Sequence, residues 1–532
     1  MSEALFLGID VGTGSARAGL FSAGGSAVGR GERAIRLWRT TPDHVEQSSD
    51  DIWAAIAGAV ADALAEAGAR GETVRGIGFD ATCSLVALDA DGRPVSVSVD
   101  GDDTRNVVVW MDHRALGDAD AINATGHPVL DFVGGTISPE MQTPKLRWLK
   151  RELPETWRRT RRWFDLPDYL TWRATGCEDR SLCTTVCKWT FLGHERRWDE
   201  SYFAAIGLEE LSADAFERIG NRVRVPGERL AGLSPQAAAE FGLAAGTPVA
   251  AALIDAHAGA LGTLGVPGVD VPVTRRMAVI AGTSACHLAV TPDRRAVPGV
   301  WGPYYEALLP GTWLLEAGIS ASGAFLDHVL ASHPARRGVS GNVFAALEET
   351  LESLLAGGET VPSLTGDLHF QPNVLGNRAP LADATLTGGL SGWRLRDDRE
   401  DLARWYLAAL QSLAYATRHI VDAFRERDCP VDLLVASGGS AASPRWCQTH
   451  ADALGMPVAV PLEADGVLLG SAMLGAAASG TCASLDAAMA AMTRPGRVVL
   501  PDPGAASFHD RKYRVYRRMI DDQRSYAAIM ST

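Results

Sequence analysis

The stretch LFLGIDVGTGSARAGLF, from Leu5 to Phe21, has the pattern that decides the fold. An apolar, strand-like run leads into a turn of glycines and small hydroxyl residues, and a second apolar run follows. A similar stretch, MAVIAGTSACHLAVT, spans Met277 to Thr291 in the second half of the chain. One such segment in each half predicts a duplicated fold whose two turns face one ligand. A pair of ordinary β-hairpins explains the same spacing equally well.

Outside these segments, strand-like apolar runs alternate with helical patterns, which predicts an α/β fold. Helical spacing of apolar residues predicts a long amphipathic helix from about Arg399 to Arg427, and another over Asp50 to Glu66. The Pro- and Gly-rich segment Gly265 to Thr274 is the best candidate for a domain boundary. We therefore expect an N-terminal domain over residues 1–268 and a C-terminal domain over residues 269–532.

Composition excludes several classes of protein. The chain has 532 residues, of which 46% are hydrophobic and 21% charged, and these ordinary globular values exclude disorder, collagen and coiled coil. Its net charge of −14, with no basic stripe, argues against nucleic acid as a partner. The N-terminus lacks the pattern of a secretory signal, so we expect a cytoplasmic protein. The uncharged run Gly466 to Leu485 could suggest a membrane span, but its small residues favour a buried, closely packed helix.

The cysteines offer a weak metal signal. Three of the eight cluster at Cys177, Cys183 and Cys187, with His194 beyond them. This spacing matches no C-x2-C zinc pattern. We therefore interpret them as reduced, mostly buried thiols and do not expect zinc.

The first glycine turn contains the residue types of a phosphate-binding loop. Glycines let backbone N–H groups approach an anion, hydroxyls and an arginine add donors, and a carboxylate can hold hydrated Mg²⁺. The residues concerned are Asp10, Gly12, Thr13, Gly14, Ser15 and Arg17. The turn is not a Walker A loop, because no Gly-Lys-Ser/Thr occurs in the chain. It is not a dinucleotide fingerprint either, because a strand follows where a helix should begin.

Three acids end apolar runs, where α/β proteins bind their ligands. Asp255 follows the strand-like run Pro248 to Ile254, Asp112 follows Val107 to Trp110, and Glu316 follows Trp313 to Leu315. Taken alone, Asp255 is explained as well by a helix cap. Lys188 is one of only four lysines, which hints at a need for an ammonium group, although a solvated lysine explains it equally.

A third glycine turn, in LLVASGGSAASPRW (Leu433 to Trp446), also follows an apolar run. A nucleotide could pass over Gly438 and Gly439, where no side chain blocks it, although Gly-Gly is also common in ordinary βα turns. Taken together, the three turns and the isolated acids suit phosphoryl transfer, in which a protein mainly positions groups and stabilises charge.

With these motifs in this order, the chain resembles the FGGY carbohydrate kinases over nearly its whole length. IDVGTGSAR is similar to the first phosphate loop, GTS (Gly282 to Ser284) to the second, and SGGSAASPRW to the adenosine motif. TPKLRWLKRE (Thr143 to Glu152) and TGGLSGWRL (Thr387 to Leu395) resemble the two family signatures in part. The resemblance implies two ribonuclease H-like domains of the actin and hexokinase superfamily, with the active site in the cleft between them.

The same resemblance assigns roles to individual residues. Asp255 falls on the family's catalytic aspartate, and Asp10 on a carboxylate that holds Mg²⁺ through water. Besides the first turn, the implied ATP-binding residues are Gly282, Thr283, Ser284, Gly438, Gly439 and Ser443. Ser443 departs from the asparagine that many members have there.

Within the family the chain resembles the ribulokinases. VVVWMDHRA, TVCKW and LLEAGISASGAFLDH are similar to ribulokinase segments, and Thr82 to Val86 (TCSLV) resembles a motif associated with D-ribulose kinases. GNRAPLAD (Gly376 to Asp383) is similar to that group as well. The implied substrate-binding residues are Thr82, Cys83, Ser84, Trp110, Asp112, Lys188, Asp255 and Glu316. Ile319 stands where relatives often have glutamine.

We therefore expect an ATP- and Mg²⁺-dependent kinase that makes D-ribulose 5-phosphate from D-ribulose, with Asp255 as general base. Kinases of L-ribulose, D-xylulose or a pentitol are the alternatives within the family, and a sugar-sensing actin-like ATPase is the alternative outside it. The expected partners are a small sugar and ATP, with no nucleic acid or membrane, in a homodimer.

Overall fold

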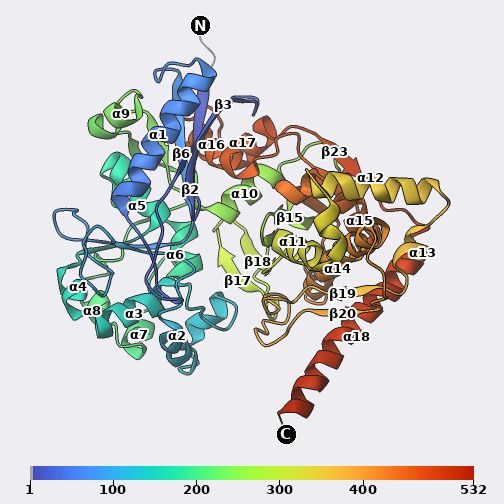
Figure 1. The fold of residues 1–532 in the computed structure, drawn as a ribbon. Helices are drawn as coiled ribbons and strands as arrows, with labels where there is room; N and C mark the ends of the chain where they lie inside the picture. The colour runs from blue at the N-terminus through green and yellow to red at the C-terminus, as the bar shows by residue number, and fades with distance from the viewer. Residues whose placement is uncertain (1–3, 532) are drawn as a thin grey trace.

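The structure, a computed structural model, describes residues 4–531. Figure 1 shows two lobes, with the blue-to-green part of the chain in one and most of the yellow-to-red part in the other. Each lobe contains one seven-stranded sheet. Helices cover the sheets, so the expected α/β class is confirmed.

The N-terminal sheet contains strands from the first half of the chain. In spatial order they are β12 (Arg229–Gly232), β13 (Pro248–Ala250), β6 (Val74–Ala81), β1 (Leu5–Val11), β2 (Ser15–Ser22) and β3 (Ala27–Ala34), and β14 (Leu253–Ile254) also pairs with β6. The run from Pro248 to Ile254 is thus two short strands rather than the one expected. Between them, Ala251 donates its N–H to the carbonyl of Glu228 on the side of β12, and β6 pairs with Val249 and again with Leu253 and Ile254.

The C-terminal sheet contains strands from the second half. In spatial order they are β17 (Trp301–Tyr305), β18 (Trp313–Ile319), β16 (Ala285–Thr291), β15 (Arg276–Ala281), β21 (Leu433–Ser437), β22 (Val458–Val460) and β23 (Arg497–Val499).

The two sheets share one topology. In the first, β1, β2 and β3 are antiparallel neighbours, and β6 and β13 continue the sheet in parallel. In the second, β15, β16 and β18 are antiparallel neighbours, and β21 and β22 continue in parallel. The two glycine turns therefore join equivalent hairpins of two like sheets, so the duplicated fold is confirmed.

The helices and smaller strands complete the lobes. The helices are α1 (Ser49–Ala67), α2 (Leu116–Asn123), α3 (Gln142–Glu152), α4 (Pro154–Arg159), α5 (Leu166–Thr175), α6 (Leu182–Lys188), α7 (Glu200–Ala205), α8 (Glu210–Ala213), α9 (Pro235–Phe241), α10 (Asp255–Leu264), α11 (Gly323–Ser332), α12 (Val343–Ala356), α13 (Val361–Thr365), α14 (Arg399–Arg425), α15 (Pro444–Leu454), α16 (Gly466–Ala478), α17 (Leu485–Met492) and α18 (Ala506–Met530). A five-stranded sheet has the order β4 (Trp38–Arg39), β5 (Val45–Gln47), β8 (Val107–Val108), β7 (Leu85–Leu88) and β9 (Arg162–Asp165). Two further pairs join β10 (Arg180–Ser181) to β11 (Val223–Arg224) and β19 (His369–Gln371) to β20 (Gly389–Ser391).

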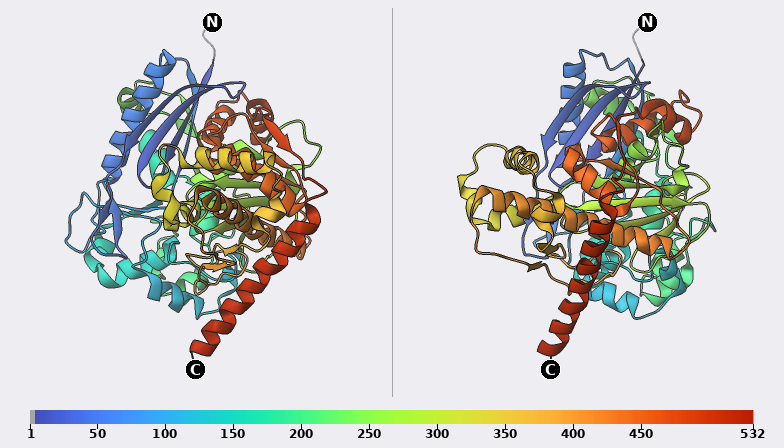
Figure 2. Two further views of the ribbon diagram at one scale, coloured as in Figure 1. Left: turned by 45° about the vertical axis from the view of Figure 1, so that its right-hand side comes forward. Right: turned by 90° about the vertical axis from the view of Figure 1, so that its right-hand side faces the viewer.

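Both predicted amphipathic helices are present. α1 begins after Ser48, whose hydroxyl accepts the N–H of Asp51, and ends at Gly68 in a left-handed conformation. α1 packs on β2 and β3. α14 packs between α11, α12 and α15, and every apolar position that predicted it is buried. Figure 2 shows α18 extending beyond the C-terminal lobe.

Two helices cross between the lobes. α10, which follows the last strands of the N-terminal sheet, packs on β15 and β21 of the C-terminal sheet. α16, from the second half of the chain, packs on β1 and β6 of the N-terminal sheet and against α10. α16 is the buried, small-residue helix expected over Gly466 to Leu485, and it ends earlier, at Ala478. In the described part of the chain, no helix is long and apolar enough to span a membrane. The division at 268/269 stays a prediction.

Candidate active site

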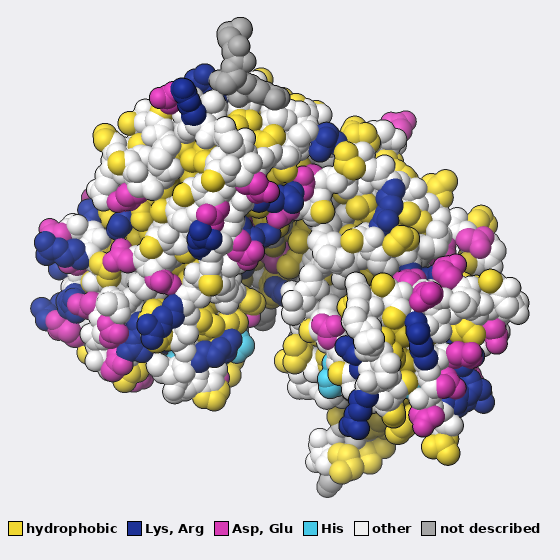
Figure 3. Space-filling model, turned by 45° about the horizontal axis from the view of Figure 1, so that its top comes forward, with side chains coloured by type: hydrophobic (Ala, Val, Ile, Leu, Met, Phe, Trp, Pro, Cys, Tyr) yellow, Lys and Arg dark blue, Asp and Glu magenta, His cyan; other side chains and the backbone are white. Residues whose placement is uncertain are grey.

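The two glycine turns of the duplicated hairpins line one cavity of about 360 Å³. Gly12 contributes from the β1–β2 turn, and Gly282, Thr283 and Ser284 contribute from the β15–β16 turn. Each turn is closed by a backbone hydrogen bond from its first glycine: Gly12 donates its N–H to the carbonyl of Ser15, and Gly282 donates its N–H to the carbonyl of Ser284. Figure 3 shows a deep groove between the lobes. The pairing of the turns thus places both loops on one ligand site.

Asp255 lies in this cavity, at the end of β14 and in the first turn of α10. One carboxylate oxygen, Oδ1, accepts the N–H of Ala256 at 2.7 Å. Burial, together with the charge of Asp10, raises the pKa of Asp255 to about 6. A carboxylate with a pKa near neutrality can accept a proton during turnover and release it afterwards. Asp255 is the first residue of α10 and Ile254 is its N-cap, without a side-chain capping bond, so the helix-cap explanation of Asp255 is wrong.

Most of the expected sugar-binding residues share the cavity. Thr82, Cys83, Trp110, Lys188 and Glu316 all line it. Burial opposes ionisation of Glu316, but a hydrogen bond from His257 and the charge of Lys188 lower its pKa to about 2. The cavity therefore presents a carboxylate and an ammonium to its contents.

Asp112 and Ser84 lie outside the lining of the cavity. Both carboxylate oxygens of Asp112 are occupied, by the guanidinium and N–H of Arg114 and by the N–H of Val45. Arg114 also binds Glu46 at 2.9 Å, so Asp112 belongs to a buried ion-pair network. Ser84 contacts the hydroxyl of Thr82 and accepts the N–H of Trp110 at 3.1 Å. We do not include Asp112 among the proposed substrate contacts, while Ser84 holds two residues that line the cavity.

Sequence reasoning missed three polar residues of the lining: Glu140, Cys286 and Arg378. The Arg378 guanidinium lies 4.2 Å from the centre of the Trp301 ring, and its Nη2 atom is 3.8 Å from Glu316 Oε1. Glu140 Oε1 is 3.7 Å from His113 Nε2. Arg378 lies in the segment GNRAPLAD, and Cys286 lies in MAVIAGTSACHLAVT. Both segments were recognised in the sequence, but these two residues were not predicted to bind a ligand.

Asp10 lies at the end of β1 beside two other charged groups. Its Oδ2 atom accepts the Nε–H of Arg17 at 2.7 Å, and Arg17 also binds Asp465 from the C-terminal half at 2.7 Å. Asp80, its register partner on β6, is fully buried, and burial together with the charge of Asp10 raises the pKa of Asp80 well above its ordinary value. Within residues 4–531, Asp80 Oδ1 lacks a hydrogen-bond partner. Carboxylate oxygens are the ligands that hydrated Mg²⁺ takes in proteins, so the carboxylate of Asp10 fits such an ion.

A second cavity, of about 530 Å³, adjoins the first. Gly282 and Thr283 line both cavities, so the β15–β16 turn separates the two. Gly439 and Ser443 line the larger one, together with apolar and aromatic side chains that include Phe344, Leu410, Tyr406 and Trp446. An elongated ligand with a flat apolar end fits the larger cavity and reaches the smaller one past Thr283.

The remaining ATP-site candidates lie near the cavities without lining them. Thr13 accepts the indole N–H of Trp110 at 2.9 Å, and the carbonyl of Gly14 accepts the N–H of Ile35. Ser15 begins β2. Gly438 has a φ of +90°, and a Cβ there would lie 2.6 Å from the carbonyl oxygen of Ala281. Glycine is therefore required where the third turn passes the end of β15 at Ala281.

Comparison with known proteins identifies the family. Residues 5–262 match the N-terminal domain of the FGGY family of carbohydrate kinases, and residues 277–479 match its C-terminal domain. The chain belongs to this family. An FGGY carbohydrate kinase domain-containing protein of Homo sapiens is 45% identical to this FGGY kinase, over 99% of this chain and 98% of its own length.

Two further relatives refine the comparison. A D-ribulokinase of Saccharomyces cerevisiae is 36% identical to this FGGY kinase, over 89% of this chain and 72% of its own length. The crystal structure of a xylulose kinase from Rhodospirillum rubrum superimposes with a TM-score of 0.80 at 22% identity, covering 98% of this chain and 99% of the other. The two-domain kinase fold implied by the sequence motifs is confirmed.

The pKa of Asp255 predicts the pH dependence of turnover. Because a general base must be ionised and this pKa is that of the ligand-free protein, we expect kcat/KM for the sugar to fall below about pH 6, by roughly tenfold for each further pH unit. An aspartate with its ordinary pKa would stay ionised down to about pH 4. Measuring kcat/KM for the sugar from pH 4.5 to 8 at saturating ATP checks this, and a kcat/KM that stays constant down to pH 5 would exclude Asp255 as the titrating group.

Proposed function

We propose that this FGGY kinase transfers the γ-phosphoryl group of ATP to a ketopentose, D-ribulose in the first place, forming D-ribulose 5-phosphate. The observation that carries the proposal is the position of Asp255, in one cavity with both glycine turns and with Lys188 and Glu316. The 36% identity to a yeast D-ribulokinase and the TCSLV segment support the choice of sugar.

In the proposed reaction, Asp255 accepts the proton of the terminal sugar hydroxyl, and the freed oxygen attacks the γ-phosphorus in line. The N–H groups and hydroxyls of the two phosphate loops, at Gly12 and Thr283, stabilise the charge on the transferring group. Mg²⁺ held through water at Asp10 would supply further positive charge there. The larger cavity would hold the adenosine, and the shared loop at Thr283 would hold the phosphates between the two cavities.

Charged groups would select the sugar. Lys188, Glu316, Glu140 and Arg378 offer both donors and acceptors to a chain of hydroxyl groups. A site that pairs its polar groups with substrate hydroxyls rejects analogues that lack them, because those groups would then be left buried and unpaired. Glycerol, with three hydroxyls, should therefore be a poor substrate.

Sugar-dependent ADP release with Mg-ATP tests this function. We expect D-ribulose to give the highest kcat/KM in a panel with L-ribulose, D-xylulose, ribitol and glycerol. A preference for another member of the panel would support kinase activity but assign a different sugar as the substrate. ATP hydrolysis that does not respond to any sugar would contradict the proposal and favour an actin-like ATPase. The homodimer and the cytoplasmic location stay predictions.

A further inference from the structure

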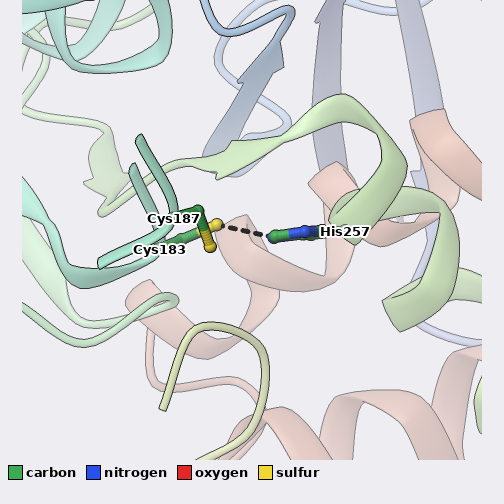
Figure 4. A group of neighbouring side chains, drawn as sticks. All are labelled: Cys183, Cys187 and His257. Atoms are coloured by element: carbon green, nitrogen blue, oxygen red, sulfur yellow. Dashed lines mark hydrogen bonds between the residues drawn. The ribbon is translucent and has the colours of Figure 1, made fainter. Parts of the chain in front are cut away.

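Two cysteines and a histidine lie behind the wall of the sugar cavity, outside its lining (Figure 4). Cys183 and Cys187 are one turn apart on α6, and His257 is the third residue of α10. All three are 0% exposed. The Sγ atom of Cys183 is 2.9 Å from Nδ1 of His257. This contact joins the helix that ends at Lys188 to the helix that begins at Asp255.

The other ring nitrogen of His257 faces the cavity wall. Its Nε2 atom is 3.4 Å from Oε2 of Glu316, on β18. The Glu316 carboxylate can only accept, so Nε2 carries the hydrogen, whether the ring is neutral or charged. The Cys183 sulfur occupies Nδ1, which leaves the ring without another orientation that satisfies both nitrogens. The hydrogen bond to Glu316 is therefore directed by Cys183.

Charge strengthens the chain of contacts. Burial opposes ionisation of Cys183, but a hydrogen bond from Cys187 and the charge of His257 lower the pKa of Cys183 to about 5. Burial likewise opposes protonation of His257, but the charge of Cys183 and the hydrogen bonds to Cys183 and Glu316 raise its pKa to about 10. Lys188 and Arg378 are the cations that face Glu316 from the other elements around it. A cationic imidazole donates from both nitrogens, which is compatible with the contacts to Cys183 and Glu316.

A metal ion is the competing occupant of this cluster. The ligand atoms of Cys183, Cys187 and His257 all lie within 4.8 Å of one another. A tetrahedral zinc ion, with bonds of about 2.3 Å to sulfur and 2.0 Å to nitrogen, needs the two atoms about 3.5 Å apart. The observed 2.9 Å between Cys183 and His257 is shorter and fits a direct hydrogen bond.

We propose that His257, held by Cys183, is a positioning residue that fixes the carboxylate of Glu316 for sugar recognition. The inference rests on the proposed function, because it takes Glu316 as a sugar contact. Neither residue lines the cavity, and Glu316 is the lining residue to which His257 is hydrogen-bonded. The charge of His257 also acts on Asp255, so the sugar KM, rather than kcat, is the quantity that reports on Glu316. A freely rotating Glu316 would have to be ordered on sugar binding, which weakens binding.

Two variants of one residue test the direction of the hydrogen bond. The amide of glutamine can replace Nε2, whereas that of asparagine reaches only as far as Nδ1. We expect His257→Asn to raise the KM for the sugar by roughly 10- to 100-fold, the loss typical of a hydrogen bond to a charged group. The KM for ATP should stay unchanged, and His257→Gln should restore the sugar KM to within about threefold. Equal effects of the two variants, or a parallel rise in the KM for ATP, would overturn the proposal.

Cysteine variants test the contact between Cys183 and His257. Cys183→Ala should raise the sugar KM in the same way, because it releases His257. Cys429→Ala, which removes another buried thiol from the C-terminal lobe, is the matched control and should leave both KM values unchanged. One equivalent of zinc in the purified protein, lost in Cys183→Ala, would overturn the hydrogen-bonded pair.

An unfolding measurement separates this inference from the proposed function. The free energies of unfolding of His257→Asn, Glu316→Gln and the double variant form a cycle that needs no substrate. We expect the double variant to lose less than the sum of the single variants, and additive losses would overturn the contact. If no sugar is phosphorylated in the panel, the proposed function fails while the cycle still reports on the pair.

Discussion

Replacing Asp255 by asparagine should lower kcat by about 10²–10⁴-fold, which corresponds to about 3–5 kcal/mol of transition-state stabilisation. Asparagine has nearly the same shape and keeps an oxygen for the N–H of Ala256, which lies 2.7 Å from the carboxylate in this structure. The variant loses only the capacity to accept the sugar proton. Fold and sugar affinity should therefore persist, so the loss should appear in kcat rather than in the sugar KM.

The control for this variant is Asp398→Asn. Asp398 also lies at a helix N-terminus, where it accepts the N–H of Asp401 at 2.7 Å. It does not line either cavity. Asparagine is an equally good N-cap, so kcat should not change. Turnover by Asp255→Asn at the level of the unaltered enzyme would contradict the role of Asp255 as general base.

Replacing Gly78 by alanine should destabilise the protein by about 3 kcal/mol, the upper part of the usual range for overpacking. A Cβ on Gly78 would lie 1.9 Å from the carbonyl oxygen of Ser471 in α16, so backbone must move. A Cβ added to Gly8 or Gly76 would likewise lie 2.1 or 2.0 Å from a backbone oxygen of the same helix. The contact joins the N-terminal sheet to a helix from the second half of the chain, so its loss should also weaken the association of the lobes.

Gly117→Ala is the matched control for Gly78→Ala. Gly117 lies in α2, where an added Cβ has no neighbour within 4 Å. Alanine favours a helix over glycine by roughly 0.5–1 kcal/mol, so the melting temperature should stay the same or rise slightly. Thermal unfolding of the two variants under identical conditions makes the comparison. An equal melting temperature for both would contradict the close approach of α16 to the sheet.

Several parts of the site could be predicted because their signal is local. The glycine turn at Gly12 and its equivalent at Gly282 follow apolar strands, and turn chemistry is encoded within a few residues. The end of a strand places Asp255 where ligands bind in α/β sheets. The spacing in the segment Arg399 to Arg427 predicted α14, because one buried face of a helix repeats every 3.6 residues.

Other parts depend on residues far apart in the chain. Asp112 was expected at the substrate because it ends an apolar run, yet it pairs with Arg114, which also binds Glu46 in a buried ion-pair network. Arg17 was expected to bind phosphate, and it also pairs with Asp465, which lies 448 residues away. No local sequence pattern predicts these ion pairs, because the paired residues come together only when the sheets and helices pack.

The sequence by itself determined the two like hairpins, the three glycine turns and the acid at the end of β14, since strand periodicity and turn geometry act over short stretches. Only the tertiary structure decided that the turns at Gly12 and Gly282 share a cavity, that α16 covers the N-terminal sheet, and that Cys183 and His257 stand behind Glu316. These contacts arise from close packing and from the need of buried polar groups for partners, which act between residues that the chain order does not bring together.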